Sequence, residues 1–135
     1  SFLLPQIANY KQIINQRKKL YSKYLEKLDE ENFNKKFFLV KKNIKNYNYH
    51  ALVLVLKFNK RSKFLNFLSK NKIFAYVGYS PLHQSKYGKK FLKSDKLHLT
   101  DNISNKIVRL PMHYNMNEKD VDYVSKKIKY FFSKN

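Results

Sequence analysis

The sequence GYSPLHQSKYGKKF occupies residues 78–91 and directly follows an apolar run at 73–77. Pro81 fixes its own φ and biases the residue before it toward extended geometry, so a turn is expected at the end of the preceding strand. Tyr79 and His83 flank this turn, where a hydroxyl and an imidazole can face a cleft and hydrogen-bond a ligand's hydroxyl groups or phosphate. The alternative is a structural loop in which Tyr79 and Leu82 pack into the core and His83 is a hydrogen-bonded loop residue.

Two further features extend this candidate site. Lys86 lies three residues after His83 and would favour a pyrophosphate nearby. The stretch RLPMHYNM at 109–116 places His113 and Tyr114 at the end of another predicted strand, in a comparable position. A core or loop role is the alternative for these two residues as well.

Apolar runs predict the strands of a small sheet. The run HALVLVL at 50–56 has nearly no polar interruption, which is typical of a strand covered on both faces. Residues 73–77 and 107–110 predict two more strands, and residues 37–40 predict a possible short one. Polar stretches on either side of this short strand predict loops.

A long amphipathic helix is predicted to begin just after Pro5 and to run to about Leu28, because residues recur along one stripe at intervals of three and four. Arg17 interrupts this stripe. Its other members are Ile7, Tyr10, Ile14, Tyr21 and Tyr24.

Two more helices are predicted further along the chain. The middle helix covers about residues 60–70, with Asn59 as its N-cap and Asn71 in the left-handed C′ position. The last helix begins after an N-cap at Asn117, has acidic residues in its first turn and lysines toward its end, and so complements the helix dipole. Its apolar face comprises Val121, Val124, Ile128 and Phe131.

These elements predict an α+β fold, with an antiparallel or mixed sheet of about three strands covered by the three helices. At 135 residues the chain is long enough for one domain with a modest core. The sequence has no cysteine, no apolar run near the ~20 residues that a membrane span needs, and no signal-peptide pattern. We therefore expect a cytoplasmic protein that is not inserted in a membrane.

The net charge of +20 raises the alternative of a basic, non-enzymatic module that binds nucleic acid. However, 26 of the 29 basic residues are lysines spread along the chain, and arginine is the residue that makes bidentate contacts to phosphate and guanine. We therefore expect only weak, non-specific nucleic-acid binding. A module of this kind would need lysines and aromatic residues gathered on one continuous face.

Several catalytic patterns are absent from the sequence. The four histidines do not form a zinc-hydrolase motif, so we expect no metal site. Ser80, His83 and Asp95 could be combined into a triad on paper, but no nucleophile elbow accompanies them. The two glycines, Gly78 and Gly88, do not make a phosphate-cradling loop.

The order Tyr-x-Pro-Leu-His, Gly, Phe and then Leu-Pro-x-x-Tyr-Asn resembles the C-terminal region of the DegT/DnrJ-type sugar aminotransferases. The resemblance covers most of the chain and is greatest to the dTDP-4-amino-4,6-dideoxygalactose transaminases. His50 and Asn48 match the family's Asn-x-His start of the small domain's first strand. Gly78 departs from a histidine that similar enzymes often show, and His113 replaces a phenylalanine.

The resemblance implies the small C-terminal domain of an aspartate-aminotransferase-type fold, with residues 1–28 as a connecting helix and 37–135 as the sheet and helices. It also implies a homodimeric enzyme that uses pyridoxal phosphate and glutamate to aminate a nucleotide-linked 4-keto-6-deoxy sugar. In such enzymes a large domain supplies the Schiff-base lysine and the aspartate that pairs with the cofactor's pyridinium nitrogen. No segment here matches that domain, so we expect this chain alone to bind no cofactor and to be inactive.

The same resemblance implies contacts to the nucleotide sugar rather than catalytic residues in this chain. The expected substrate-binding residues are His50, Tyr79, His83, Lys86 and His113.

Overall fold

The computed structural model describes residues 3–30, 33–40, 47–78, 80–91 and 97–134. Its helices and strands, in chain order, are α1 (Leu3–Ala8), α2 (Tyr10–Leu28), β1 (Phe37–Leu39), β2 (Leu52–Leu56), α3 (Arg61–Lys70), the 3₁₀ turn η2 (Leu82–Gln84), α4 (Lys86–Phe91), α5 (His98–Ser104), β3 (Ile107–Leu110) and α6 (Glu118–Lys134). The α+β class is therefore confirmed.

The sheet is antiparallel, with the strand order β1-β2-β3. Leu54 of the central strand pairs with Leu39 on one side and with Val108 on the other. Because directly paired side chains project to the same face, these residues define the core face of the sheet. The predicted strands at 37–40, 50–56 and 107–110 are confirmed.

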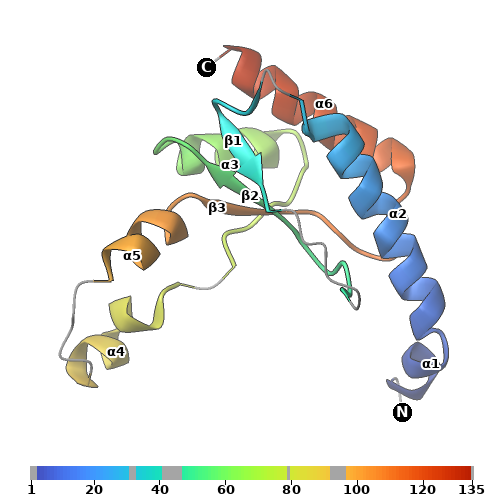
Figure 1. Cartoon of the computed structure of the whole chain (residues 1–135), viewed down its shortest axis with the longest axis horizontal. Coiled ribbons are helices and arrows are strands. Elements are labelled where there is room, and N and C mark those ends of the chain that lie inside the picture. The colour runs from blue at the N-terminus through green and yellow to red at the C-terminus, as the bar shows by residue number, and fades with distance from the viewer. Residues whose placement is uncertain (1–2, 31–32, 41–46, 79, 92–96, 135) are drawn as a thin grey trace.

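Three helices supply the other half of the core. Buried residues of α2, α3 and α6 share one hydrophobic cluster with the core face of the sheet. The rings of Phe64 on α3 and Phe132 on α6 lie 5.1 Å apart, and Phe132 contacts Phe37 of β1 at the same distance. Figure 1 shows α2 and α6 running side by side. Burying each large apolar side chain contributes about 1.5–3 kcal/mol.

The last helix begins as predicted. Asn117 Oδ1 accepts hydrogen bonds from the backbone N–H groups of Lys119 (2.9 Å) and Asp120 (3.2 Å), and the Asp120 carboxylate accepts one from the backbone N–H of Asn117 (2.8 Å). This reciprocal arrangement satisfies donors that a helix start otherwise leaves unpaired. The predicted apolar face of the helix is buried throughout.

The prediction for the first helix was wrong at its start. Pro5 lies inside α1, where a first-turn proline is tolerated because its missing N–H has no helical partner. The Asn9 side chain bonds Pro5 O (3.0 Å) at the break between α1 and α2. Ile7 and Tyr10 are exposed, and the buried residues of α2 are confined to its second half.

Two predicted cap positions were also wrong. The residue before α3 is Lys60 rather than Asn59, and it makes no side-chain cap bond. At the other end, Asn71 keeps a negative φ and bonds Phe67 O through its side chain (2.8 Å), while Lys72 adopts the left-handed conformation with a φ of 58°.

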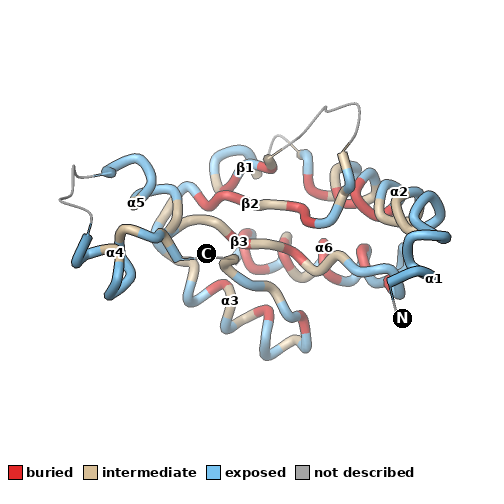
Figure 2. The backbone as a smooth tube through the Cα atoms, turned by 90° about the horizontal axis from the view of Figure 1, so that it is seen from below, coloured by how far each residue is buried: buried red, intermediate tan, exposed pale blue. Residues whose placement is uncertain are grey.

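The strand predicted at 73–77 is not formed. A single antiparallel bridge joins Tyr76 to Arg109 at the free edge of β3. The sequence also did not predict α4 and α5, which with η2 form an arm that projects away from the sheet (Figure 1). The arm is largely exposed, in contrast to the buried strands and the middle of α6 (Figure 2).

No helix in the described part of the chain is both long and apolar enough to cross a membrane.

Candidate functional site

The sheet has a second face, opposite the core helices, and Arg109 lies on it. The neighbours of Arg109 along β3, Val108 and Leu110, point into the core, so alternation directs Arg109 to the other side. Val53 of β2 pairs directly with Arg109, and Tyr76 pairs with it on the opposite flank through backbone bonds of 3.1 and 2.7 Å. Arg109 is therefore a half-buried cation between two neighbours on this second face.

Gly78 follows Tyr76 and lies against the Arg109 side chain. Its φ of +84° is in the region that residues with a Cβ rarely adopt. A Cβ built on Gly78 would lie 3.0 Å from Arg109 Nε and 3.1 Å from its Cζ. Glycine thus provides both the turn and the space that the guanidinium group fills.

Tyr21, Tyr47 and Tyr49 form a cluster of aromatic rings. Tyr47 packs edge-on against Tyr21 and Tyr49, with ring centroids 5.8 and 4.9 Å apart. Burial raises the pKa of the Tyr47 hydroxyl, and the positive charge of Arg109 opposes that rise.

His50 borders the cluster. Its ring lies 6.4 Å from that of Tyr47, and its Nδ1 is 2.7 Å from Asn48 Oδ1. The intervening Tyr49 has a φ of 49°, an uncommon conformation for a non-glycine residue, and turns the chain into β2. His50 itself is exposed, so its imidazole is oriented by Asn48 and remains accessible.

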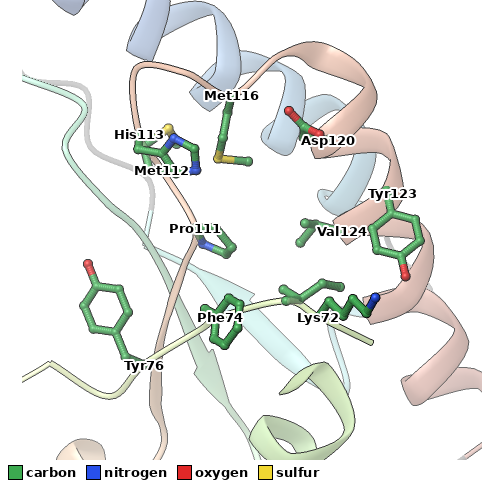
Figure 3. A pocket seen from close by; sticks show the side chains of 11 residues that line it. Lys72, Phe74, Tyr76, Pro111, Met112, His113, Met116, Asp120, Tyr123 and Val124 are labelled. Atoms are coloured by element: carbon green, nitrogen blue, oxygen red, sulfur yellow. The ribbon is translucent and has the colours of Figure 1, made fainter. Parts of the chain in front are cut away.

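His113 lines a pocket of about 540 Å³ between the loop after β3, the 72–76 segment and α6 (Figure 3). Figure 3 shows Tyr76, Phe74 and Met112 around the pocket, so the wall of the pocket is mainly apolar and aromatic. The residues of its lining with polar side-chain groups are Lys72, Tyr76, His113, Asp120 and Tyr123. The loop that carries His113 is anchored by Tyr24, whose hydroxyl donates to Pro111 O at 3.1 Å.

His83 lies in η2, on the projecting arm. Its Nε2 is 2.7 Å from Asp101 Oδ1 of α5, and Gln84 also donates to that oxygen. The bond from His83 holds the pKa of the Asp101 carboxyl below its usual value, with a smaller contribution from Gln84. An ionised carboxylate only accepts hydrogen bonds, so Nε2 of His83 carries the hydrogen in this contact. Nδ1, the other ring nitrogen, is not the atom that faces Asp101.

Gly88 allows α4 to pack on the turn that carries His83. A Cβ on Gly88 would lie 2.0 Å from Leu82 O, far inside van der Waals contact. The Ser85 hydroxyl donates to Leu82 O (2.7 Å) and accepts from Gly88 N (2.8 Å), which closes the turn. Lys86 begins α4 and is exposed.

The predicted binding residues fall into two groups. His50 and His113 lie beyond the same end of the β2–β3 ladder, which finishes at the pair Leu52 and Leu110. His83 and Lys86 lie on the arm. After the Tyr76 bridge the chain runs toward the opposite end of β3 and there enters the arm.

Tyr79 is outside the described residues, as is Asp95. Arg109 and Asp101 were not among the predicted binding residues. Arg109 begins the stretch RLPMHYNM at 109–116, but only its strand register reveals that it lies on the second face of the sheet. Asp101 is 18 residues from its partner His83, and no spacing rule connects them.

Apolar side chains are uncovered at both extremities of the molecule. On α1, Leu4 is 68% exposed and Ile7 55% exposed, and Tyr10 at the start of α2 is also exposed. On the arm, Leu82 and Tyr87 are also largely exposed. Described lysines lie on α2, α3, α4 and α6 alike.

The sequence profile of the DegT/DnrJ/EryC1/StrS aminotransferase family matches residues 1–129. The fold is similar to that of the aminotransferase PseC of Helicobacter pylori, involved in the biosynthesis of pseudoaminic acid, with a TM-score of 0.87 and 18% identity over 98% of this chain and 36% of that one. DesV of S. venezuelae, solved with a ketimine intermediate, gives a TM-score of 0.84 and 15% identity over 96% of this chain and 34% of its own.

A putative sugar aminotransferase, Spr1654 of Streptococcus pneumoniae, gives a TM-score of 0.78 and 20% identity over 97% of this chain and 33% of its own. The chain therefore spans about a third of the length of these solved structures. No curated protein sequence matches the chain significantly.

Proposed function

Because the chain belongs to the DegT/DnrJ/EryC1/StrS aminotransferase family, we propose that it is the small C-terminal domain of a pyridoxal-phosphate-dependent sugar aminotransferase. The observation that carries this proposal is the extent of the matches. They cover 96–98% of this chain but only 33–36% of the solved enzymes. In this proposal residues 1–28 connect the two domains, and residues 37–135 form the small domain.

The chain's role in that enzyme is to position the substrate. His50, Tyr79, His83, Lys86 and His113 are the proposed contacts to the nucleotide sugar. The imidazoles of His50 and His83 support this role. Asn48 orients the first and Asp101 the second, and each imidazole can hydrogen-bond a hydroxyl group or a phosphate oxygen. The aromatic pocket beside His113 is suited to a sugar or base ring.

The substrate proposed is a dTDP-linked 4-keto-6-deoxy hexose, aminated at C4 with glutamate as the donor for the synthesis of a surface-polysaccharide sugar. The support is the order of the motifs at 78–91 and 109–116. The complete enzyme would be a cytoplasmic homodimer. Gly78 and His113, where similar enzymes often show other residues, are the positions at which sugar preference would differ.

Neither the pocket beside His113 nor the turn at Gly88 fits pyridoxal phosphate. The pocket of Figure 3 holds one lysine, Lys72, and one acid, Asp120, but Asp120 accepts the backbone bond of Asn117 and belongs to a helix cap. The space at Gly88 is filled by the Leu82 carbonyl, so this glycine does not cradle a phosphate. We therefore assign the cofactor, its Schiff-base lysine and its aspartate to a large domain, with none bound by this chain alone.

The test joins this chain to the family's large domain. If the DNA upstream encodes such a segment in frame, the joined protein should bind pyridoxal phosphate and transfer the amino group of glutamate to a dTDP-4-keto-6-deoxy sugar. The chain alone should do neither. Stoichiometric borohydride-fixed labelling of one lysine in the isolated chain, together with turnover, would contradict the proposal. Scattered low-level labelling would not, because many amines are exposed.

A further inference from the structure

His83 has two ring nitrogens, and only one of them is paired. Nε2 lies 2.7 Å from Asp101 Oδ1, and no second hydrogen bond to the ring is found in the parts of the chain that the structure describes. The buried, unpaired side-chain atoms of the described residues are Arg17 Nε and Ser125 Oγ, so Nδ1 of His83 is not buried. Although the side chain is only 13% exposed, its Nδ1 edge therefore reaches the surface of the arm, where a ligand can meet it.

Asp101 determines which of the two nitrogens carries the hydrogen. The ordinary pKa of an aspartate carboxyl is 3.8, and the bond from His83 lowers the pKa of Asp101 further, so this group is an ionised carboxylate at neutral pH. A carboxylate offers only lone pairs, so the imidazole donates from Nε2. A neutral imidazole has a single N–H group, so Nδ1 keeps its lone pair and acts as a hydrogen-bond acceptor.

Asp101 is itself held in place. Gln84 donates a second hydrogen bond to the same Oδ1, which an ionised carboxylate can accept. The backbone N–H of Asp101 donates to Leu97 O (2.9 Å), and the Ser104 hydroxyl donates to Asp101 O (3.1 Å). The carboxylate thus has a fixed position in α5, from which it sets the orientation of the His83 ring across 18 residues of sequence.

An acceptor at Nδ1 discriminates among the groups of a nucleotide-linked sugar. A sugar hydroxyl has a hydrogen that it can donate to Nδ1. The ionised oxygens of a diphosphate only accept hydrogen bonds, as those of a carboxylate do, so they would direct their own lone pairs at the lone pair of Nδ1. Among the groups of such a ligand, a hydroxyl is therefore the one that fits His83.

We propose that Asp101 is a positioning residue that fixes the tautomer of His83, so that Nδ1 accepts a hydrogen bond from a hydroxyl group of the sugar. This inference rests on the proposed function and deepens it, because it assigns His83 to the sugar rather than to the diphosphate. Asp101 touches no substrate itself and acts through His83. Without Asp101, both neutral tautomers would be populated and the ring could turn away.

The test observes the imidazole nitrogens of the full 135-residue chain by nitrogen NMR in a slightly alkaline buffer. The chain has four histidines, and the spectrum of His83→Gln identifies the signals of His83. The two neutral tautomers and the imidazolium give different shifts for the two ring nitrogens, so the spectrum reports the position of the hydrogen directly. We expect the tautomer of His83 that carries its hydrogen on Nε2.

Two variants and a control separate this role from a purely structural one. Asp101→Ala removes the acceptor, and both neutral tautomers of His83 should then be populated. Asn102→Ala, at the exposed neighbouring position of α5, is the matched control and should leave the His83 signals unchanged. If Asp101→Ala disrupts the arm, Asp101→Asn keeps the shape of the side chain and removes its charge. The amide can present either its oxygen or its NH₂ group to Nε2, so the preference for one tautomer should again be lost.

Two ligands identify the group that Nδ1 meets. Thymidine diphosphoglucose and thymidine diphosphate differ only in the glucose unit. We expect the first to shift the Nδ1 signal of the parent chain saturably and the second to leave it unchanged. In the joined enzyme, Asp101→Ala should raise the KM for the nucleotide sugar about three- to tenfold, as the loss of one hydrogen bond would, with kcat nearly constant.

The inference is overturned if Nδ1 of His83 carries a hydrogen in the parent chain, if the Asp101 variants leave the tautomer unchanged, or if thymidine diphosphoglucose shifts Nδ1 no more than thymidine diphosphate does. These outcomes are separable from failure of the proposed function. If the joined enzyme transfers no amino group although thymidine diphosphoglucose shifts Nδ1, the proposed function fails and the role of Asp101 stands. If the enzyme is active but Asp101→Ala changes neither the KM nor the tautomer, only the inference fails.

Discussion

Replacing Gly88 with alanine tests how the arm positions His83. In an unhindered helix, Gly→Ala stabilises by about 0.5–1 kcal/mol, because alanine loses less backbone entropy. At Gly88 the added Cβ would lie 2.0 Å from Leu82 O, 2.9 Å from Leu82 C and 3.0 Å from His83 Cα. All three atoms belong to the backbone of the turn, so no side chain can rotate away to relieve the contact.

The size of the required movement follows from these distances. Real Cβ atoms essentially never approach a heavy atom within 3.0 Å, so α4 and the turn must separate by at least about 1 Å. The bond from His83 Nε2 to Asp101 Oδ1 measures 2.7 Å. A displacement of ~1 Å along it gives about 3.7 Å, which is beyond hydrogen-bonding range. We therefore expect Gly88→Ala to release His83 from Asp101.

The assay is the NMR spectrum of the His83 imidazole, recorded with thermal unfolding of the whole chain. The imidazole resonances should move toward those of an unbonded histidine. The melting temperature should change little, since the residues of α4 and α5 are not buried and contribute little to the core. Lys89→Ala, at the exposed neighbouring position, is the control and should leave His83 unchanged.

The reasoning would be refuted by a Gly88→Ala chain in which the His83 resonances match those of the parent and α4 is stabilised. Such a result would mean that Gly88 is an ordinary helical glycine.

Three further changes have expected outcomes. Tyr24→Phe leaves the Pro111 carbonyl without its 3.1 Å bond in a buried site and should lower the free energy of unfolding by about 1–3 kcal/mol, measured in urea. Asn117→Ala removes the side-chain cap of α6 and should cost about 1 kcal/mol in the same experiment. Lowering the pH should dissociate His83 from Asp101. Because the pKa of Asp101 is lowered in the folded state, the ionised carboxylate contributes stability above the ordinary pKa of 3.8. This contribution is lost as the pH falls through the folded-state pKa. Loss of the His83 bond well above pH 3.8 would contradict this assignment.

The strands and the last helix were predictable because their signals are local and strong. The apolar run of β2 specifies a strand with a buried core face, and its second face is partly covered too, with Val55 buried and Val53 half-buried. The capping pattern at Asn117 coincides with the start of the apolar periodicity of α6, so two independent signals agree. The helix cap predicted at Asn59 had only the residue type to support it, and it was wrong.

The segment at 73–77 shows why an apolar run alone is insufficient. It has the composition of a strand, but it lies at the edge of β3 and makes one bridge, while Ile73 packs into the core and Phe74 is exposed. An edge segment gains backbone bonds on one side only, so its pairing depends on tertiary context. The arm was missed for a similar reason. Its helices are short, with no buried face to produce a periodic pattern.

The candidate site depended on long-range geometry that motifs do not encode. The sequence identified His50, His83 and His113 one by one, and the ladder then separated His83 from the other two. The position of Arg109 is defined by its pairing with Tyr76 and by the space at Gly78, which are contacts between β3 and a segment distant in the sequence. Residue type therefore identified candidate binding groups, and register shows which of them lie at the same end of the β2–β3 ladder.

The uncovered apolar residues give a physical reason to regard this domain as part of a larger enzyme. In a self-sufficient domain, a helix is expected to bury its apolar stripe along its whole length. Here α2 buries its second half, while its first turn and α1 expose Leu4, Ile7 and Tyr10. Leu82 and Tyr87 are exposed on the arm at the other extremity. A large domain that packs against α1 and the arm would remove these groups from water. Binding of a nucleotide sugar between the two domains would then stabilise their docking, and docking would in turn strengthen the binding.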